Sequence, residues 1–279
     1  MRASLRLRPA PLVAVVALVA LAACSSGGDD PVDVVRAAPE KTIDAGTARV
    51  AINIAVASTG TTGAVTGEGA FDLQEGRGAF SLNLGAFGAS FGATTLDAVL
   101  EGSTIFVRVP PQLAAAAGNK QWVRIDLSTL SQQTGVDIGS LGQLQSVDPS
   151  QALRFLEGAV DDMEEVGEEP VRGEQTTHYR GTVDLRRASA EVDADARAAV
   201  DQAIESLGTS TFPADVWVDD EGRLRKLSFE IARTDAGPQS AGRVELELYD
   251  FGTDVNAQPP PADQTTDLTS LFAGTPGRR

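Results

Sequence analysis

The sequence has few of the side chains on which most catalytic and metal sites depend. Its 279 residues include one histidine, one cysteine, two tryptophans and two tyrosines. A single cysteine excludes an internal disulfide framework and every multi-cysteine metal or iron–sulfur site. A single histidine excludes poly-histidine zinc sites and leaves one candidate for the commonest general base. We therefore expect no metal, no other cofactor and no enzymatic activity.

Positive charge is also scarce. The chain has 23 Lys and Arg against 39 Asp and Glu, a net charge of -16. Proteins that bind nucleic acids need a basic surface to neutralise phosphates, so we expect no nucleic-acid partner. The sequence also lacks a phosphate-binding loop and a dinucleotide fingerprint.

Two features could suggest chemistry, and both have simpler interpretations. His178 lies in Gln175–Arg180, which resembles a strand and has no nucleophile elbow nearby, so a structural role is predicted. Asp219–Gly222 is too short for a calcium loop and is typical of a hairpin turn. A carboxylate hydrolase remains an alternative because acids are numerous, but aromatic residues for stacking a sugar are few.

Residues 1–23 have the pattern of a lipoprotein signal peptide. Three arginines precede the apolar run Pro11–Leu21, which is too short for a stable membrane-spanning helix. Removal of residues 1–23 would leave 256 residues. It would also remove three positive charges from the net charge of -16, which then becomes -19. Such an acidic body is not expected to bind anionic lipid head groups by itself.

The only cysteine follows this run directly. Leu21–Cys24 resembles a bacterial lipobox, in which diacylglycerol is attached to the cysteine after cleavage; the alternative is an ordinary signal peptide with an incidental cysteine. Residues 24–31 then form a flexible tether. Because two acyl chains make a stable anchor, we expect palmitate-type lipidation at Cys24 and a location on the outer face of the cell membrane.

Residues 32–257 are predicted to form one domain rich in strands, and residues 258–279 a tail. Val50, Ile52, Ile54 and Val56 alternate with smaller or polar residues, which is typical of a strand. About ten such segments follow one another across short turns, which favours antiparallel pairing. They begin near residues 47, 64, 78, 96, 104, 121, 175, 215, 224 and 243, and a further strand is expected within Asp161–Glu169.

Helical spacing predicts three further segments. Val32–Ala45 is expected to form one or two short helices, because Pro39 should kink or split it. A second helix should begin at Asp148–Ser150, and Glu191–Leu207 has the clearest apolar stripe. The predicted fold is α+β, a curved antiparallel half-barrel sheet of about ten strands with helices covering the concave side.

The strands carry small residues, so the covering helices need not fill the space on the apolar side. An apolar cavity is the usual form of a lipid site. The candidate lining residues are Phe71, Leu73, Phe80, Leu82, Leu84, Phe106, Trp217, Leu227 and Phe229. Gly85–Thr95 contains Phe87 and Phe91 among small residues; it is interpreted either as a loose continuation of a hairpin or as an apolar flap at the cavity mouth.

The order of these motifs resembles the mycobacterial LppX and LprG type of lipoprotein. The lipobox is followed by Ala45–Val50 (AGTARV), Trp122–Asp126 (WVRID) and Asp148–Ser150; Gly181–Leu185, Phe212–Asp219 and Gly222–Leu224 come later. The resemblance covers most of Val32–Phe251. It implies a LolA-like half-barrel with a hydrophobic cavity for multi-acyl lipids.

The leading hypothesis is therefore a membrane-anchored lipoprotein that binds acylated lipids or glycolipids and carries them between the membrane and the outer envelope. Its expected partners are the lipid, the cell membrane through Cys24, and a membrane transporter. The alternative is a scaffold or binding lipoprotein of the envelope that has the same fold with a filled core.

Overall fold

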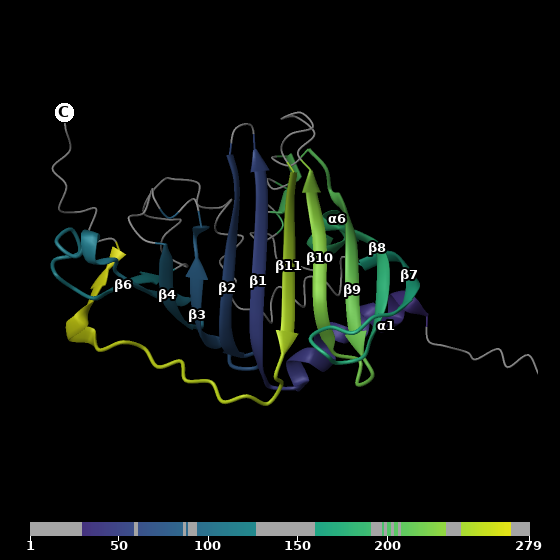
Figure 1. Ribbon diagram of the computed structural model, residues 1–279, viewed down its shortest axis with the longest axis horizontal. Coiled ribbons are helices and arrows are strands. Elements are labelled where there is room, and N and C mark those ends of the chain that lie inside the picture. Colours follow the sequence, from purple (N-terminus) through teal and green to yellow (C-terminus); the bar gives the residue numbers. More distant parts are fainter. Residues whose placement is uncertain are drawn as a thin grey trace, which may run out of the picture.

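The computed structural model describes residues 30–58, 61–85, 94–126, 160–190, 208–232 and 241–268, with isolated residues 88, 197, 200, 201, 204 and 205. A single sheet of 12 strands dominates it, in the order β12-β6-β5-β4-β3-β2-β1-β11-β10-β9-β8-β7 (Figure 1). The strands are β1 Thr47–Ser58, β2 Thr61–Asp72, β3 Arg77–Asn83, β4 Thr95–Glu101, β5 Thr104–Arg108, β6 Trp122–Asp126, β7 Val160–Glu168, β8 Thr176–Asp184, β9 Thr211–Asp219, β10 Leu224–Ala232, β11 Ala241–Tyr249 and β12 Thr265–Asp267.

The sheet is open and almost entirely antiparallel. Strands β1 to β6 form one meander and β7 to β11 another, and the two join where β1 pairs with β11. Only β12 is parallel to its neighbour, β6. The predicted antiparallel sheet is confirmed. The structure adds β12 within the segment that was expected to be a tail; its three residues have too short a pattern to predict a strand.

Helix α1, Pro31–Asp44, packs against β7, β9 and β10 on one face of the sheet (Figure 1). Asp30 caps it by accepting a hydrogen bond from the Val32 amide at 2.9 Å. The helix is continuous through Pro39, so of the two predicted alternatives the single helix is the one that forms. Pro39 is buried together with Val35 and Ala38, and this packing offsets the loss of one backbone hydrogen bond.

The strand register defines two faces of the sheet, because directly paired residues point to the same side. We call the side that bears α1 the apolar face and the other side the polar face. The main core lies on the apolar face beneath α1, where Val35, Val160, Val216 and Leu224 are at most 1% exposed. The hydrophobic core therefore sits between the helix and the sheet.

A smaller cluster lies on the polar face. Val99, Phe106 and Trp122 are buried there, and Ala257 packs on them. Ala257 belongs to the extended segment 253–261, which runs from β11 to β12 along one end of the sheet (Figure 1). This segment is followed by the short 3-10 helix Ala262–Gln264.

The remaining elements named within the described ranges are short. They are α6, Leu185–Ala190, and the 3-10 helix Pro111–Leu113. The turn Asp219–Gly222 joins β9 to β10, which confirms the predicted hairpin. No helix in the described ranges is long and apolar enough to cross a membrane.

Several predicted features lie outside the described residues. They include the signal peptide, Cys24, Phe87, Phe91 and the helix expected after Asp148. Of the predicted helix Glu191–Leu207, only five residues are described, and all five are helical.

Candidate functional site

The apolar face has two parts that differ in burial. Beneath α1 its side chains are fully buried. Strands β11, β1, β2, β3, β4, β5 and β6 carry other apolar side chains on this face that are only partly buried. These are Ile52, Ile54, Val65, Leu82, Leu96, Ile105, Val107, Val123, Ile125, Val244 and Leu246. A continuous apolar surface thus extends from the packed core toward the β6 side of the sheet.

Seven of the nine predicted lining residues lie on or at the end of this face. Phe71, Leu73, Phe80, Leu227 and Phe229 belong to one cluster with α1. Leu82 pairs with Leu96 on the same face, and Leu84 is buried just beyond the end of β3. The tertiary structure therefore brings residues from β2, β3 and β10 to one apolar surface.

Glycines shape this surface on β2 and β3. The rings of Phe71 and Phe80 stack with centroids 5.8 Å apart. Phe71 lies against Gly78, and Phe80 lies against Gly69, so closely that a Cβ atom at either glycine would clash with the aromatic residue. The absence of a side chain at Gly78 therefore leaves room for the Phe71 ring, and its absence at Gly69 lets β3 approach closely at Phe80.

Phe106 and Trp217 lie on the polar face instead. Phe106 pairs with Val99 in the smaller cluster, and Trp217 pairs with His178 and Lys226. Trp217 stands between Val216 and Val218, so apolar side chains point to both faces of β9. The sequence pattern alone could not decide which of these residues faced α1.

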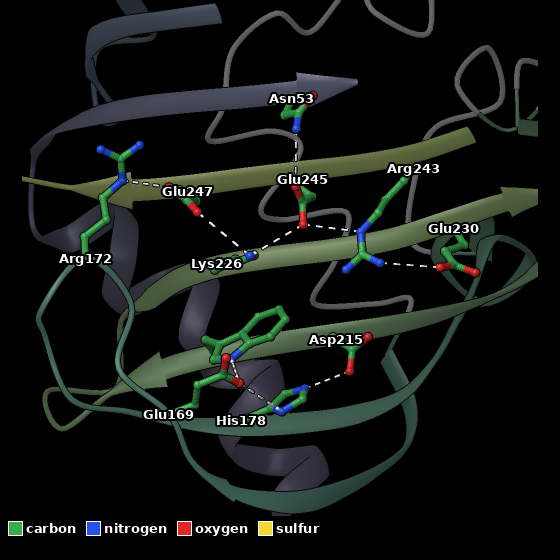
Figure 2. A network of polar contacts seen from close by, with 11 residues as sticks. Asn53, Glu169, Arg172, His178, Asp215, Lys226, Glu230, Arg243, Glu245 and Glu247 are labelled. Atoms are coloured by element: carbon green, nitrogen blue, oxygen red, sulfur yellow. Dashed lines mark hydrogen bonds and ion pairs between the residues drawn. The ribbon is translucent and has the colours of Figure 1, made fainter. Parts of the chain in front are cut away.

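Around Trp217, the polar face carries a buried histidine. The His178 side chain is 8% exposed and its Nε2 atom lies 2.7 Å from Asp215 Oδ1. Its Nδ1 atom lies 3.6 Å from Glu169, whose carboxylate also accepts a hydrogen bond from the Trp217 indole (Figure 2). His178 is thus hydrogen-bonded through Nε2 and lies between two carboxylates, which fits the structural role predicted for it.

The electrostatics of this cluster favour the ionised form of Asp215. Burial of Asp215 by itself would raise the pKa of its carboxyl group, but hydrogen bonds from His178 and Arg180 outweigh that effect and the pKa is lowered. Asp215 therefore stays ionised and anchors both basic groups.

A second polar network extends over β10, β11 and β1. Lys226 lies 3.5 Å from Glu245 and 3.9 Å from Glu247 (Figure 2). Arg172, from the loop between β7 and β8, donates to Glu247 at 2.6 Å. Burial would lower the pKa of Arg172, but its hydrogen bond and charge interaction with Glu247 raise it. Sequence reasoning missed this network, because nothing in a loop sequence indicates which strand its arginine will reach.

Two hollows formed by described residues stand out, and neither of these two is lined by the predicted cavity residues. One is a groove of about 540 Å³ on the polar face, between Arg172 and β4. The other, of about 370 Å³, lies between α1 and the β9–β10 turn. No group of three or more His, Cys, Asp or Glu residues within the described ranges could hold a metal ion.

Comparisons with known proteins point to lipoproteins. A protein of Streptomyces griseus, known only as an uncharacterized 31.2 kDa protein, is 32% identical over 174 residues, which cover 59% of this chain and 55% of the relative. A protein of Streptomyces coelicolor, named as a candidate lipoprotein, is 28% identical over 187 residues, covering 65% of this chain and 54% of the relative. The matched segments thus span about half the length of these curated relatives.

Solved structures similar to this chain include two mycobacterial lipoproteins. LppX of Mycobacterium tuberculosis is 16% identical, with a TM-score of 0.49, and the match covers 82% of this chain and 100% of LppX. LprF of Mycobacterium bovis is 12% identical, with a TM-score of 0.47, covering 82% of this chain and 96% of LprF. The LppX_LprAFG lipoprotein family matches residues 95–257, more than half of the chain. The chain therefore belongs to the LppX_LprAFG lipoprotein family.

Proposed function

We propose that this chain is an extracytoplasmic lipoprotein, anchored to the outer face of the cell membrane by a lipid on Cys24, that binds acylated lipids on the apolar face of its sheet. The observation that supports this best is the partly exposed apolar surface beyond α1. Acyl chains that leave water for such a surface gain roughly 0.8 kcal/mol per buried methylene. Binding of this kind needs no chemical step.

The predicted lining residues on the apolar face divide into buried and partly buried side chains. Phe71 and Leu73 are at most 5% exposed, so they pack within the core beside the proposed lipid surface. Phe80, Leu82, Leu227 and Phe229 are only partly buried and are the side chains that would touch the acyl chains. Phe87 and Phe91 remain candidates for the mouth of the site.

The experiment is lipid extraction and mass spectrometry of the full chain purified from the membranes of its native host. The wild-type protein should carry acyl lipid. A Leu82→Gln, Leu96→Gln double variant should lose most of it, because the two paired side chains place amides on the apolar face. The control is Asn83→Gln with Thr95→Gln, the neighbouring pair on the opposite face of the same strands.

Lipid-free wild-type protein in repeated preparations would contradict the proposal. So would equal lipid loss in both double variants. Lipid carriage is tested separately: wild-type protein should speed the transfer of a labelled diacyl lipid between two vesicle populations, and the Leu82→Gln, Leu96→Gln variant should not. Binding without transfer would restrict the role to lipid binding.

A scaffold role with a filled core is the second candidate. It is favoured by the packing beneath α1, where Val35 and Val216 are fully buried. Two results together would support this role: wild-type protein that is free of lipid, and a Leu82→Gln, Leu96→Gln variant that is clearly less stable than the wild-type protein.

A further inference from the structure

Most of the residues that line the groove on the polar face are polar. It crosses β11, β1, β2, β3 and β4, and the loop residue Arg172 forms part of its wall. Its polar lining residues are Asn53, Thr66, Glu68, Ser81, Asn83, Thr95, Arg172, Glu245 and Glu247. It lies on the opposite side of the sheet from the proposed lipid surface and does not depend on that proposal.

Strand register arranges part of the groove as a regular row. Glu247 pairs with Ala51, Ala51 pairs with Glu68, Glu68 pairs with Ser81, and Ser81 pairs with Asp97. Carboxylates on β11, β2 and β4 therefore alternate with short side chains on β1 and β3. Because adjacent strands are about 4.8 Å apart, successive carboxylates in the row are separated by about 10 Å.

The first gap in the row holds a guanidinium group. Arg172 donates to Glu247 at 2.6 Å and lies 3.9 Å from Glu68, on either side of Ala51. Its guanidinium also lies over the ring of Tyr249, 3.9 Å from the ring centroid. The structure thus shows that a guanidinium group fits between two of these carboxylates.

The second gap has the same strand spacing as the first, and its central residue, Ser81, donates a hydrogen bond to Asp97 at 2.9 Å. Ser81 stands between Glu68 and Asp97, whose side chains are 65% and 51% exposed. Arg172 reaches Glu68 from one side, and Arg108 reaches Asp97 at 3.4 Å from the other. Both carboxylates keep enough exposed surface to accept further hydrogen bonds.

The neighbouring row is already paired within the protein. Lys226 and Arg243 lie 3.5 Å and 3.3 Å from Glu245, which also accepts a hydrogen bond from Asn53 Nδ2 at 3.4 Å. The acceptors that remain exposed in the first row are the carboxylates of Glu68 and Asp97. The ligand that suits these two carboxylates is rich in N–H donors.

We propose that this groove docks a basic, arginine-containing segment of a partner protein, with one guanidinium between Glu68 and Asp97. Guanidinium carries five N–H donors in a planar fork that matches carboxylate geometry. The net charge of -16 further attracts a basic segment over distance. Arg172 lies in the first gap, between Glu247 and Glu68, as the partner's arginine would lie in the second gap, between Glu68 and Asp97.

The experiment measures binding of an acetylated tetra-arginine amide to the full-length protein by fluorescence anisotropy at fixed ionic strength. Glu68→Gln with Asp97→Asn should raise the Kd about tenfold or more, because both carboxylates of the second gap are lost. The control is Glu40→Gln with Asp44→Asn on α1. It removes the same charge from exposed acids on the other side of the sheet and should change the Kd by less than about twofold. Circular dichroism melts establish that each variant is folded.

A third variant tests the first gap independently. Arg172→Ala opens the position between Glu247 and Glu68, so the Kd for tetra-arginine should fall. The proposal is overturned if wild-type protein does not bind the peptide, or if the α1 control weakens binding as much as the groove variant. It is also overturned if Arg172→Ala leaves the Kd unchanged, or if free spermine binds as tightly as the peptide, since the site would then take small polyamines.

Discussion

The imidazole of His178 stacks on the indole of Trp217, with ring centroids 4.4 Å apart and planes inclined by 8°. The two residues are directly paired on β8 and β9. Each is also bonded to a carboxylate, His178 to Asp215 and Trp217 to Glu169. The stack therefore ties two neighbouring strands and the loop after β7 together on the polar face.

Replacement of His178 separates the stacking from the polar contacts. His178→Ala should lower the free energy of unfolding by about 2 kcal/mol, because it removes a stacked ring and leaves the Trp217 face exposed. His178→Phe keeps a flat ring and should lose about 1 kcal/mol. Urea titration followed by tryptophan fluorescence measures both. Arg180→Ala is the control; its side chain is 62% exposed and should contribute less than about 0.5 kcal/mol. A larger loss for His178→Phe than for His178→Ala would show that the stack contributes nothing.

Thr42 joins α1 to the sheet through its hydroxyl group. It is fully buried, donates to the Ala38 carbonyl oxygen and accepts a hydrogen bond from the Leu224 amide at 2.8 Å. Thr42→Val keeps the shape but leaves the Leu224 amide unsatisfied, so the free energy of unfolding should fall by about 1 to 3 kcal/mol. Thr42→Ser keeps the hydroxyl group and should recover most of the loss. Equal stability of the valine and serine variants in urea would contradict the role of this hydrogen bond.

Asp219 should make the fold sensitive to acid. Its side chain is 3% exposed, and burial by itself would raise the pKa of its carboxyl group. Hydrogen bonds from Arg223 and Arg225 outweigh burial, so the pKa is lowered. A carboxyl group with a lowered folded pKa stabilises the protein above its unfolded pKa, near 3.9, and this stabilisation is lost as pH falls through the folded value. The free energy of unfolding should therefore fall below about pH 4.

The Asp219→Asn variant measures this contribution. At pH 7 it should be less stable by about 3 kcal/mol, because Arg225 is buried and loses its charged partner. Its stability should also decline less between pH 5 and pH 3 than that of the wild-type protein. Asp220→Asn, at the exposed neighbouring position of the turn, should match the wild-type protein at both pH values. Parallel pH curves for wild type and Asp219→Asn would refute the assignment.

The proposed lipid-binding surface and the proposed docking groove lie on opposite faces of one sheet. Leu82 faces the apolar side, whereas its chain neighbours Ser81 and Asn83 line the polar groove. Because successive side chains of a strand alternate between faces, the same strands can bind an apolar ligand on one face and a charged ligand on the other. The variants chosen for each face therefore serve as controls for the other.

The sequence predicted much of the sheet because its strands have a clear period of two. Val50, Ile52 and Ile54 all face the apolar side, as their alternation indicates. Alternation fails where both neighbours are apolar, as at Trp217, and Phe106 was likewise assigned to the wrong side. Pro39 illustrates a different limit, since its cost to a helix is local but the burial that offsets it comes from distant strands.

Composition and local pattern by themselves determined the scarcity of catalytic side chains, the acidic charge, the antiparallel pairing and the β9–β10 turn, because these depend on residues close together in the chain. Only the tertiary structure decided which face each apolar residue occupies, that β12 pairs with β6, and that Arg172 reaches Glu247 and Glu68. Those contacts join residues 75 or more positions apart. They follow from the register and packing of the whole sheet, which local pattern does not specify.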